Sequence, residues 1–214
     1  MTKGVNDYNR LASVYDLLTS TLFAGRVDKA QFAFMGYLPE NGRIIWLGGG
    51  TGRQINRLFE VAKPMELWYI DKSEKMVEKA RRNCKKEYHR NIRFICGTQK
   101  DLPSDMKFDA AITFFFFDQF ERVELIRIFI KIHQTLRPGA IWLWADFVQP
   151  VGWWQSCLMK MMFLFFSITT GLKTRRVFDL PHLFRRKGYQ QMDSASFFGE
   201  FIRSIPFKEQ SELQ

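Results

Sequence analysis

The chain has 214 residues, of which 46% are hydrophobic and 16% aromatic, and this composition predicts one globular domain rather than a disordered chain. Its net charge of +10 is compatible with nucleic acid, an anionic membrane or acidic substrates as partners, but the basic residues are spread over predicted helices, where a solvated face is the commoner reason. Three cysteines and three histidines lack metal-ligand spacing, so neither a structural metal nor a disulfide framework is predicted.

The first stretch of the chain is predicted to be helical. Residues 7–37 place apolar side chains close to a 3.6-residue period before residues 39–42 break the pattern; these side chains are Leu11, Val14, Tyr15, Leu17, Leu18 and Leu22. An amphipathic helix of this kind could cover one edge of a sheet. Residues 1–10 are polar and charged rather than apolar, which favours a cytoplasmic protein.

A strand, a tight turn and a helix follow, and they are the strongest feature of the sequence. Apolar residues 43–47 run directly into four glycines, and a helical pattern occupies residues 53–61; the glycines are Gly48, Gly49, Gly50 and Gly52. Glycines at such a turn permit positive φ angles and let the backbone approach a ligand, while the helix offers free N–H groups. The spacing differs from the dinucleotide fingerprint, because Arg53 stands where its last glycine would fall.

The next elements continue an alternation of strand and helix. A second strand, residues 66–70, ends in Asp71, an acid about 20 residues after the glycine turn, which is the arrangement that binds a pair of ribose hydroxyls. Ser73 is predicted to cap a helix that runs to about Lys86. A third strand over residues 91–96 leads into a turn over residues 97–103.

The fourth strand, residues 108–117, is apolar on both faces, as expected for the middle of a parallel sheet covered by helices. Asp118 and Gln119 follow directly, at the carboxyl end of the strand, where open α/β sheets place ligand contacts. Asp118 is therefore the leading candidate for an acid/base or orienting residue, with capping of the next helix as the alternative. That helix is predicted over residues 121–136, and a fifth strand over residues 140–147.

Residues 150–173 are very apolar, but Lys160 interrupts them, so they are not predicted to span a membrane. Three interpretations stay open, in this order: a lid over an apolar substrate, a dimer face, or a helix lying on lipid beside basic residues.

The 22 phenylalanines favour an apolar pocket or surface about as much as a Phe-rich core. A last helix from Leu180 and two strands, over residues 190–196 and 201–207, complete the chain.

In order and spacing, these features resemble the class I S-adenosylmethionine (SAM) dependent methyltransferases of the ubiquinone/menaquinone-biosynthesis, small-molecule type, over about residues 8–207. The resemblance rests on the glycine turn, on the segment 71–76 and on residues 136–147. It implies an α/β, Rossmann-like sheet of seven strands, mostly parallel with an antiparallel closing strand and with helices on both faces. The chain would be one domain, 1–214, with an N-terminal helical cap over 1–42 and an apolar lid insertion over 150–175.

The resemblance also implies the site residues. SAM would be contacted by Gly48, Gly49, Gly50, Gly52, Asp71, Lys72, Met76, Thr98, Gln99 and Phe114. Tyr15 and Asp118 would face the transferred methyl group and act as the catalytic residues. Two departures from the family are visible: it carries an acid where this chain has Trp46, and often another where this chain has Thr98.

The expected function is therefore methyl transfer from SAM to an apolar small molecule. A nucleic-acid substrate is not expected, because the exit of the fourth strand lacks the Asn/Asp-Pro-Pro-aromatic sequence that base methyltransferases use. A peripheral membrane contact and a homodimer remain open. The alternatives are a non-catalytic protein of the same fold, given the two missing acids, and a nicotinamide-dependent oxidoreductase, which would share the sheet and Asp71.

Overall fold

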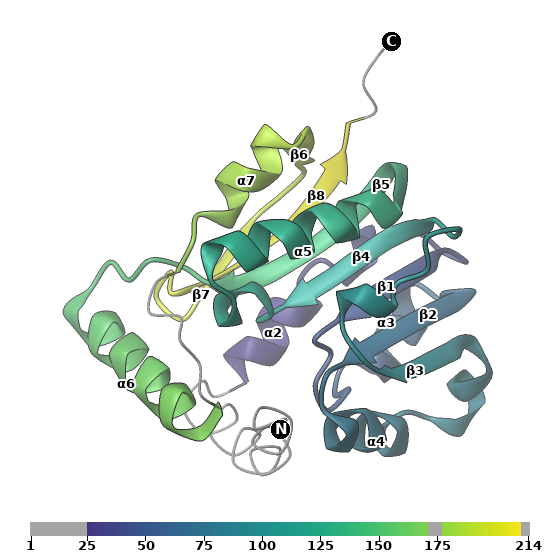
Figure 1. Cartoon of the computed structure of the whole chain (residues 1–214), viewed down its shortest axis with the longest axis horizontal. Coiled ribbons are helices and arrows are strands. Elements are labelled where there is room, and N and C mark those ends of the chain that lie inside the picture. Colours follow the sequence, from purple (N-terminus) through teal and green to yellow (C-terminus); the bar gives the residue numbers. More distant parts are fainter. Residues whose placement is uncertain (1–24, 171–176, 211–214) are drawn as a thin grey trace.

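The computed structural model describes residues 25–170 and 177–210, and for residues 165–170 it describes the backbone only. Its strands are β1 (Arg43–Leu47), β2 (Glu66–Asp71), β3 (Ile92–Cys96), β4 (Phe108–Phe114), β5 (Leu136–Phe147), β6 (Tyr189–Gln191), β7 (Ala195–Phe197) and β8 (Ile202–Glu209). They form one sheet in the order β3-β2-β1-β4-β5-β8-β6, with β7 paired to β8 (Figure 1). The first five strands are parallel to their neighbours and β8 is antiparallel to β5, so the predicted mostly parallel sheet with an antiparallel closing strand is confirmed.

Helices cover both faces of this sheet. They are α2 (Arg26–Phe32), α3 (Ile55–Val61), α4 (Glu74–Asn83), α5 (Arg122–Thr135), α6 (Trp153–Thr170) and α7 (Leu180–Arg186), with short 3-10 turns η1 (Met35–Tyr37), η2 (Lys86–Asn91), η3 (Gln99–Asp101) and η4 (Phe117–Gln119). One core cluster packs α2, α3, α4 and α6 against one face, and a second packs α5 and α7 against the other. Successive residues of β1 alternate between the two clusters, which is why its whole run is apolar.

Local sequence signals place most helix ends correctly. The Ser73 hydroxyl accepts a hydrogen bond from the amide of Met76 at 3.3 Å and begins α4, as predicted. The helix ends at Asn83 rather than near Lys86, because Cys84 adopts an extended conformation and η2 follows. Residues 25–37 hold α2 and η1, while residues 1–24, with Tyr15 and most of the expected N-terminal cap, lie outside the described residues.

The closing strands differ from the prediction in one respect. The strand expected over residues 190–196 is divided into β6 and β7, which pair with successive stretches of β8 and give eight strands in seven sheet positions. The amide of Met192 still donates a hydrogen bond to the carbonyl of Pro206 at 2.9 Å, and the pairing with β8 shifts by one residue between β6 and β7. Residues 137–139, expected as a loop, lie inside β5, where the pairing with β4 shifts register.

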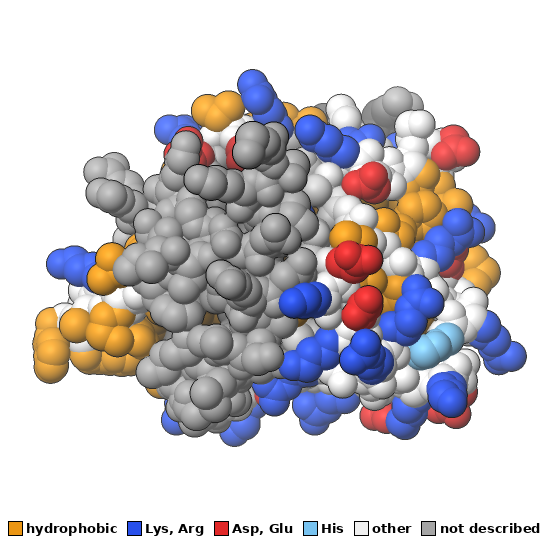
Figure 2. All heavy atoms as spheres, turned by 60° about the horizontal axis from the view of Figure 1, so that its bottom comes forward, with side chains coloured by type: hydrophobic (Ala, Val, Ile, Leu, Met, Phe, Trp, Pro, Cys, Tyr) orange, Lys and Arg blue, Asp and Glu red, His pale blue; other side chains and the backbone are white. Residues whose placement is uncertain are grey.

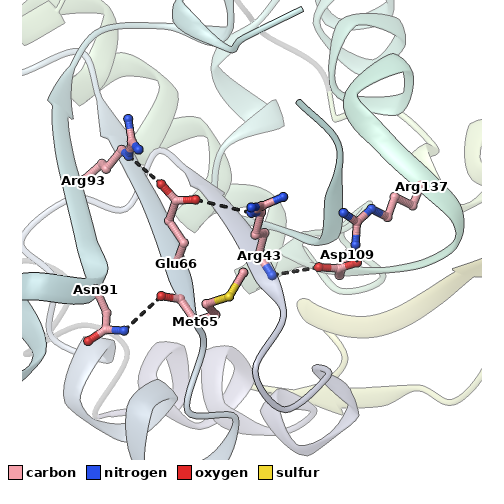
Figure 3. Close-up of polar contacts among 7 residues, drawn as sticks. All are labelled: Arg43, Met65, Glu66, Asn91, Arg93, Asp109 and Arg137. Carbon is pink, nitrogen blue, oxygen red and sulfur yellow. Dashed lines mark hydrogen bonds and ion pairs between the residues drawn. The ribbon is translucent and has the colours of Figure 1, made fainter. Parts of the chain in front are cut away.

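An ion-pair network fastens the amino ends of the central strands, opposite to the edge where ligands bind in this class of sheet (Figure 3). Glu66 of β2 pairs with Arg43 of β1 and with Arg93 of β3. Asp109 of β4 accepts a hydrogen bond from the backbone amide of Arg43 at 2.8 Å and pairs with Arg137 of β5. The network therefore joins all five parallel strands and leaves their carboxyl ends to the glycine turn and the acids that follow.

The surface carries charge of both signs. In Figure 2, Lys and Arg side chains gather toward the side of α4 and η2, with acidic side chains among them, while hydrophobic side chains show on the side of α6. Exposed ion pairs such as Arg82–Glu78 and Lys85–Glu60 accompany the basic residues of α4 and of the segment after it. Across the described stretches, no helix has both the length and the hydropathy to cross a bilayer.

Candidate cofactor and acceptor site

The glycine turn lies between β1 and α3, and each glycine has an identifiable reason to be there. Gly48, Gly50 and Gly52 have φ angles of 67°, 62° and 71°, in the left-handed region that other residues adopt at a cost. A Cβ atom at Gly49 would lie 2.1 Å from the Tyr69 ring, and one at Gly52 would lie 2.7 Å from the Cβ of Ala80. A Cβ at Gly50 would meet no atom of the described residues within 4 Å, so this part of the turn is open among them.

Asp71 ends β2 directly beside this turn. Its Oδ2 accepts a hydrogen bond from the amide of Gly50 at 2.9 Å, and its Oδ1 accepts one from the amide of Ser73 at 2.9 Å. Burial raises the pKa of the Asp71 carboxyl, and these two amide donors offset part of the rise. The carboxyl thus joins the glycine turn to the start of α4, and it stays partly exposed, as the prediction of a ribose-binding acid requires.

Aromatic side chains support the turn where the family has an acid. Trp46 is 2% exposed and lies edge-on to Tyr69 and Phe114, with ring centroids 5.6 and 5.7 Å away. The Tyr69 hydroxyl donates a hydrogen bond to the carbonyl of Gly50 at 3.1 Å. Phe114, predicted to contact the cofactor, is 3% exposed and packs in the core beside Trp46. The indole Nε1 of Trp46 is buried and has no hydrogen-bond partner among the described residues.

A polar cluster that the sequence did not reveal lies next to the turn. The side-chain amide of Gln54 donates a hydrogen bond to Oδ1 of Asp28 at 3.0 Å, and Arg53 pairs with the other oxygen of Asp28 at 3.5 Å. Gln54 is 5% exposed, and its Oε1 has no hydrogen-bond partner among the described residues. No sequence signal links Asp28 to the turn, because only tertiary packing of α2 beside α3 brings them together.

The turn after β3 is closed by its own side chains. The Thr98 hydroxyl accepts a hydrogen bond from the amide of Lys100 at 3.3 Å, and the amide of Thr98 donates to Oδ2 of Asp101 at 2.8 Å. Thr98 is thus the N-cap residue of η3, and it forms a capping box with Asp101, an acid in the same turn.

The other predicted cofactor contacts lie on the same edge of the sheet. Lys72 is exposed directly after β2, Met76 is 7% exposed in the first turn of α4, and Gln99 is half-buried in η3. The fold therefore places the residues predicted after β1, β2 and β3 around one edge, as expected for the carboxyl ends of neighbouring parallel strands.

Aromatic side chains line the carboxyl ends of β4 and β5. Phe115 has a φ angle of 50°, a strained conformation for a residue with a large side chain, and its ring lies edge-on to Phe147 at 5.1 Å. The side-chain amide of Gln119 donates a hydrogen bond to the carbonyl of Phe115 at 3.3 Å. Met159 and Phe163 of α6 belong to the same cluster, so α6 adjoins the apolar side of these strand ends.

Asp118 lies in η4 directly after β4. It does not cap α5, whose N-cap residue is Glu121 with no side-chain cap hydrogen bond, so the capping alternative is wrong. The Oδ1 atom of Asp118 is buried without a hydrogen-bond partner among the described residues. Burial raises the pKa of Asp118 from 3.8 to about 6, which brings a carboxyl into the range of a general base that works near neutral pH.

The raised pKa of Asp118 predicts a pH-dependent gain in stability for Asp118→Asn. Because the folded-state pKa lies above the unfolded value, stability is fully present below 3.8 and is lost as the pH rises through about 6. Two pKa units correspond to about 3 kcal/mol. The free energy of unfolding of Asp118→Asn, measured by urea titration, should exceed that of the wild type by up to this amount at pH 7.5, and by little at pH 4. An equal difference at both pH values would contradict the raised pKa.

Comparisons with known proteins agree with this geometry. Residues 44–139 match the family described as a methyltransferase domain. The structure of a putative methyltransferase from Haloferax volcanii, in complex with the methyltransferase activator Trm112, is similar with a TM-score of 0.74 at 14% identity, over 99% of this chain and 100% of that one. A comparison with curated protein sequences gave no match.

Two further solved structures share the fold. Magnesium protoporphyrin IX methyltransferase (ChlM) from Synechocystis PCC 6803, with bound S-adenosylhomocysteine, has a TM-score of 0.63 at 18% identity, over 86% of this chain and 82% of that one. The mitomycin 7-O-methyltransferase MmcR has a TM-score of 0.68 at 13% identity; 94% of this chain is covered but only 60% of MmcR, so the chain spans about three fifths of that protein.

The residues of the site fit the polar groups of SAM. The space at Gly50 that the described residues leave open, the carboxyl at the end of β2 and the half-buried polar groups after β3 suit an adenosine group. Trp46 Nε1 and Gln54 Oε1, which are buried without a hydrogen-bond partner among the described residues, suit a polar end group. The nicotinamide alternative has no such support. Residues 44–139 therefore form a methyltransferase domain, and S-adenosylmethionine is the cofactor that its glycine turn and strand-end acid fit.

Proposed function

We propose that the protein transfers the methyl group of SAM to an apolar small molecule that binds between the carboxyl ends of β4 and β5 and helix α6. The observation that carries this proposal is the aromatic and apolar lining at that place. Phe115 and Phe147 pack edge to face at the two strand ends, and Met159 and Phe163 of α6 belong to the same cluster. An apolar wall beside the methyl-transfer edge favours an acceptor with apolar area to bury.

For the cofactor, we propose that Asp71 accepts hydrogen bonds from the ribose hydroxyls. Each of its oxygens takes one backbone amide, which leaves further acceptor capacity on both. At the other end of the cofactor, Gln54 and Asp28 would provide acceptors for an ammonium group and compensate for the acid missing at Trp46. The buried Oε1 of Gln54 has no hydrogen-bond partner among the described residues, and such an atom is costly unless a ligand donor satisfies it, which supports this assignment.

SAM supplies an electrophilic methyl group on a sulfonium ion, so the chain must mainly align the acceptor and remove a proton from it. Asp118 is proposed as the base, because its carboxyl is ionised above a pKa of about 6 and follows the central strand. Tyr15, the other predicted catalytic residue, lies outside the described residues and stays a prediction from the sequence.

The proposal predicts opposite behaviour for two neighbouring residues of α6. Phe163 is half-buried against the core cluster, whereas Leu164 is 62% exposed. Phe163→Asp should raise KM for an apolar acceptor at least about tenfold or abolish turnover while SAM affinity is retained, and the matched control Leu164→Asp should keep both. Formation of S-adenosylhomocysteine, measured across a panel of apolar phenols, amines and thiols, provides the assay. Full activity of folded Phe163→Asp on the best acceptor would refute the lid function.

The outer face of α6 decides between the remaining interpretations. Trp153, Met161 and Leu164 are 84%, 55% and 62% exposed. If this face binds a second copy of the chain, Leu164→Asp should convert a dimer into a monomer in light scattering. If it lies on lipid, the same change should abolish co-sedimentation with anionic liposomes. A protein partner, such as the activator bound by the Haloferax volcanii protein, is the third interpretation.

A further inference from the structure

The first turn of α6 is joined to the turn between β7 and β8 through a buried side chain. Gln155 is 3% exposed, and its Nε2 donates a hydrogen bond to the carbonyl of Gly199. Its Oε1 accepts hydrogen bonds from the amides of Val151 at 2.7 Å and Gly152 at 2.9 Å, which directly precede the helix. Because a backbone amide only donates and a carbonyl only accepts, these partners fix the orientation of the side-chain amide. Gln155 therefore forms a bridge from α6 to the β7–β8 turn.

The turn that Gln155 holds has a strained backbone. Phe198, Gly199 and Glu200 have successive φ angles of 53°, 62° and 68°, in the left-handed region that is costly for residues with a Cβ atom. A Cβ at Gly199 would lie 3.2 Å from Cζ2 of Trp154, and the Trp154 ring lies edge-on to Phe198 at 5.2 Å. Strained conformations persist where the surrounding structure holds them, and they are common beside ligand sites. Trp154 and Gln155, consecutive residues of α6, supply such contacts here.

The bridge adjoins the aromatic wall of the proposed acceptor site. Phe201 follows the strained turn and is fully buried; its ring lies 5.2 Å from that of Phe147 and 6.3 Å from that of Trp154. The amide of Val148 donates a hydrogen bond to the carbonyl of Phe201 at 3.0 Å, which joins the turn to the end of β5. Contacts between rings therefore continue from the end of β5, through Phe201, to the first turn of α6.

The spacing of residues along α6 links the bridge to the acceptor site. Met159 and Phe163 follow Gln155 by four and eight residues, so all three lie on one face of the helix. Met159 is 7% exposed and Phe163 is half-buried, and both belong to the cluster that contains Phe115 and Phe147. A displacement of the first turn of α6 would therefore displace the side chains that the helix packs against the ends of β4 and β5.

We propose that Gln155 is a positioning residue for the methyl acceptor, because its bridge to Gly199 holds Met159 and Phe163 in place against the strand ends. The proposal rests on the proposed function. Gln155 acts on the acceptor only through α6, so its loss affects acceptor binding rather than the methyl-transfer step. The alternative is that Gln155 only stabilises the fold. In that case its loss lowers the melting temperature and leaves acceptor binding unchanged.

Gln155→Met tests the proposal by steady-state kinetics, since Met is similar in length but cannot replace the three hydrogen bonds. KM for the best acceptor among apolar phenols, amines and thiols should rise about tenfold, while kcat and SAM affinity stay within about twofold. The matched control is Ser156→Ala, which removes a hydroxyl bonded to the carbonyl of Gly152 at 3.1 Å and leaves the bridge intact. It should keep the wild-type KM. A folded Gln155→Met protein with a lower melting temperature and an unchanged KM would overturn the proposal.

Amide hydrogen exchange, followed by NMR in the full chain without ligands, reports on the bridge itself. The amides of Val151 and Gly152 donate to Gln155 in the wild type, so they should exchange at least about tenfold more slowly than in an unstructured peptide. Gln155→Met should remove this protection. Gly199→Ala acts from the other side, because its Cβ would press on Trp154, and it should raise KM in the same way. Unprotected amides of Val151 and Gly152 in the wild type would overturn the proposal even if neither variant folds.

Failure of the proposed function gives a different result from failure of this inference. If the wild type methylates no apolar acceptor, the proposed function fails, whatever the exchange rates of the two amides. If the wild type methylates one and Gln155→Met does so with the same KM, only the positioning role of Gln155 fails.

Discussion

Replacing Asp71 by Ala should weaken SAM binding about ten- to a hundredfold, or roughly 1.5–3 kcal/mol, as measured by isothermal titration calorimetry. The physical reason is the loss of charge-assisted hydrogen bonds to two ribose hydroxyls. The same carboxyl also accepts hydrogen bonds from the amides of Gly50 and Ser73, so its removal deletes a hydrogen bond that holds the glycine turn in place. Both effects act on the cofactor site and in the same direction.

A carboxyl at the opposite edge of the sheet provides the matched control. Asp109 also accepts a backbone amide, that of Arg43, and pairs with Arg137, but it belongs to the network at the amino ends of the strands (Figure 3). Asp109→Ala should lower the melting temperature and leave SAM affinity unchanged. Unchanged SAM affinity in folded Asp71→Ala would show that this carboxyl does not hold the ribose, and the cofactor would have to lie elsewhere along the edge.

The glycine turn and Asp71 could be located from the sequence because the information is local. An apolar run ending in glycines predicts a strand and a tight turn, and the structure gives those glycines positive φ angles or too little space for a side chain. Once two parallel strands are adjacent, as β1 and β2 are, their carboxyl ends meet. The position of Asp71 beside Gly50 then follows without knowledge of the rest of the fold.

Contacts between distant segments could not be predicted in this way. Asp28 and Gln54 meet because α2 packs near α3, and Asp118 and Asp146 lie on neighbouring elements because η4 contacts β5. Neither pair has a sequence spacing that marks it. Asp146 belongs to the segment 136–147 that carries the resemblance, but its burial, and an Oδ2 without a hydrogen-bond partner among the described residues, are visible only in the fold.

The sequence could show that acids were missing at Trp46 and Thr98, but not what replaces them. Trp46 fills the space under the turn together with Tyr69, and the hydroxyl of Tyr69 holds the carbonyl of Gly50. Thr98 caps η3 and shares a capping box with Asp101. In each case the lost acid is replaced by packing or by local hydrogen bonds that preserve the backbone, which is why these substitutions leave the fold intact.

Replacing Asp118 by Asn should lower turnover by about 10²–10⁴ and leave SAM affinity nearly unchanged, if the carboxyl removes a proton from the acceptor. Asn matches the carboxyl in size and keeps a hydrogen-bond acceptor, but it cannot take up a proton. The buried Oδ1 has no partner that the change would break among the described residues, so the loss of activity should not come from unfolding. Stability should in fact rise at neutral pH, because the cost of a buried charge is removed.

An acid three residues away provides the control for this variant. Glu121 is exposed and makes no side-chain cap hydrogen bond at the start of α5, so Glu121→Gln should retain wild-type turnover. Single-turnover kinetics with saturating SAM separate the methyl-transfer step from product release. An Asp118→Asn protein that is more stable at pH 7.5, binds SAM normally and turns over at the wild-type rate would show that burial of this carboxyl has no catalytic purpose. A variant that is more stable but inactive would show that the buried Asp118 carboxyl lowers the free energy of unfolding and supplies the base needed for turnover.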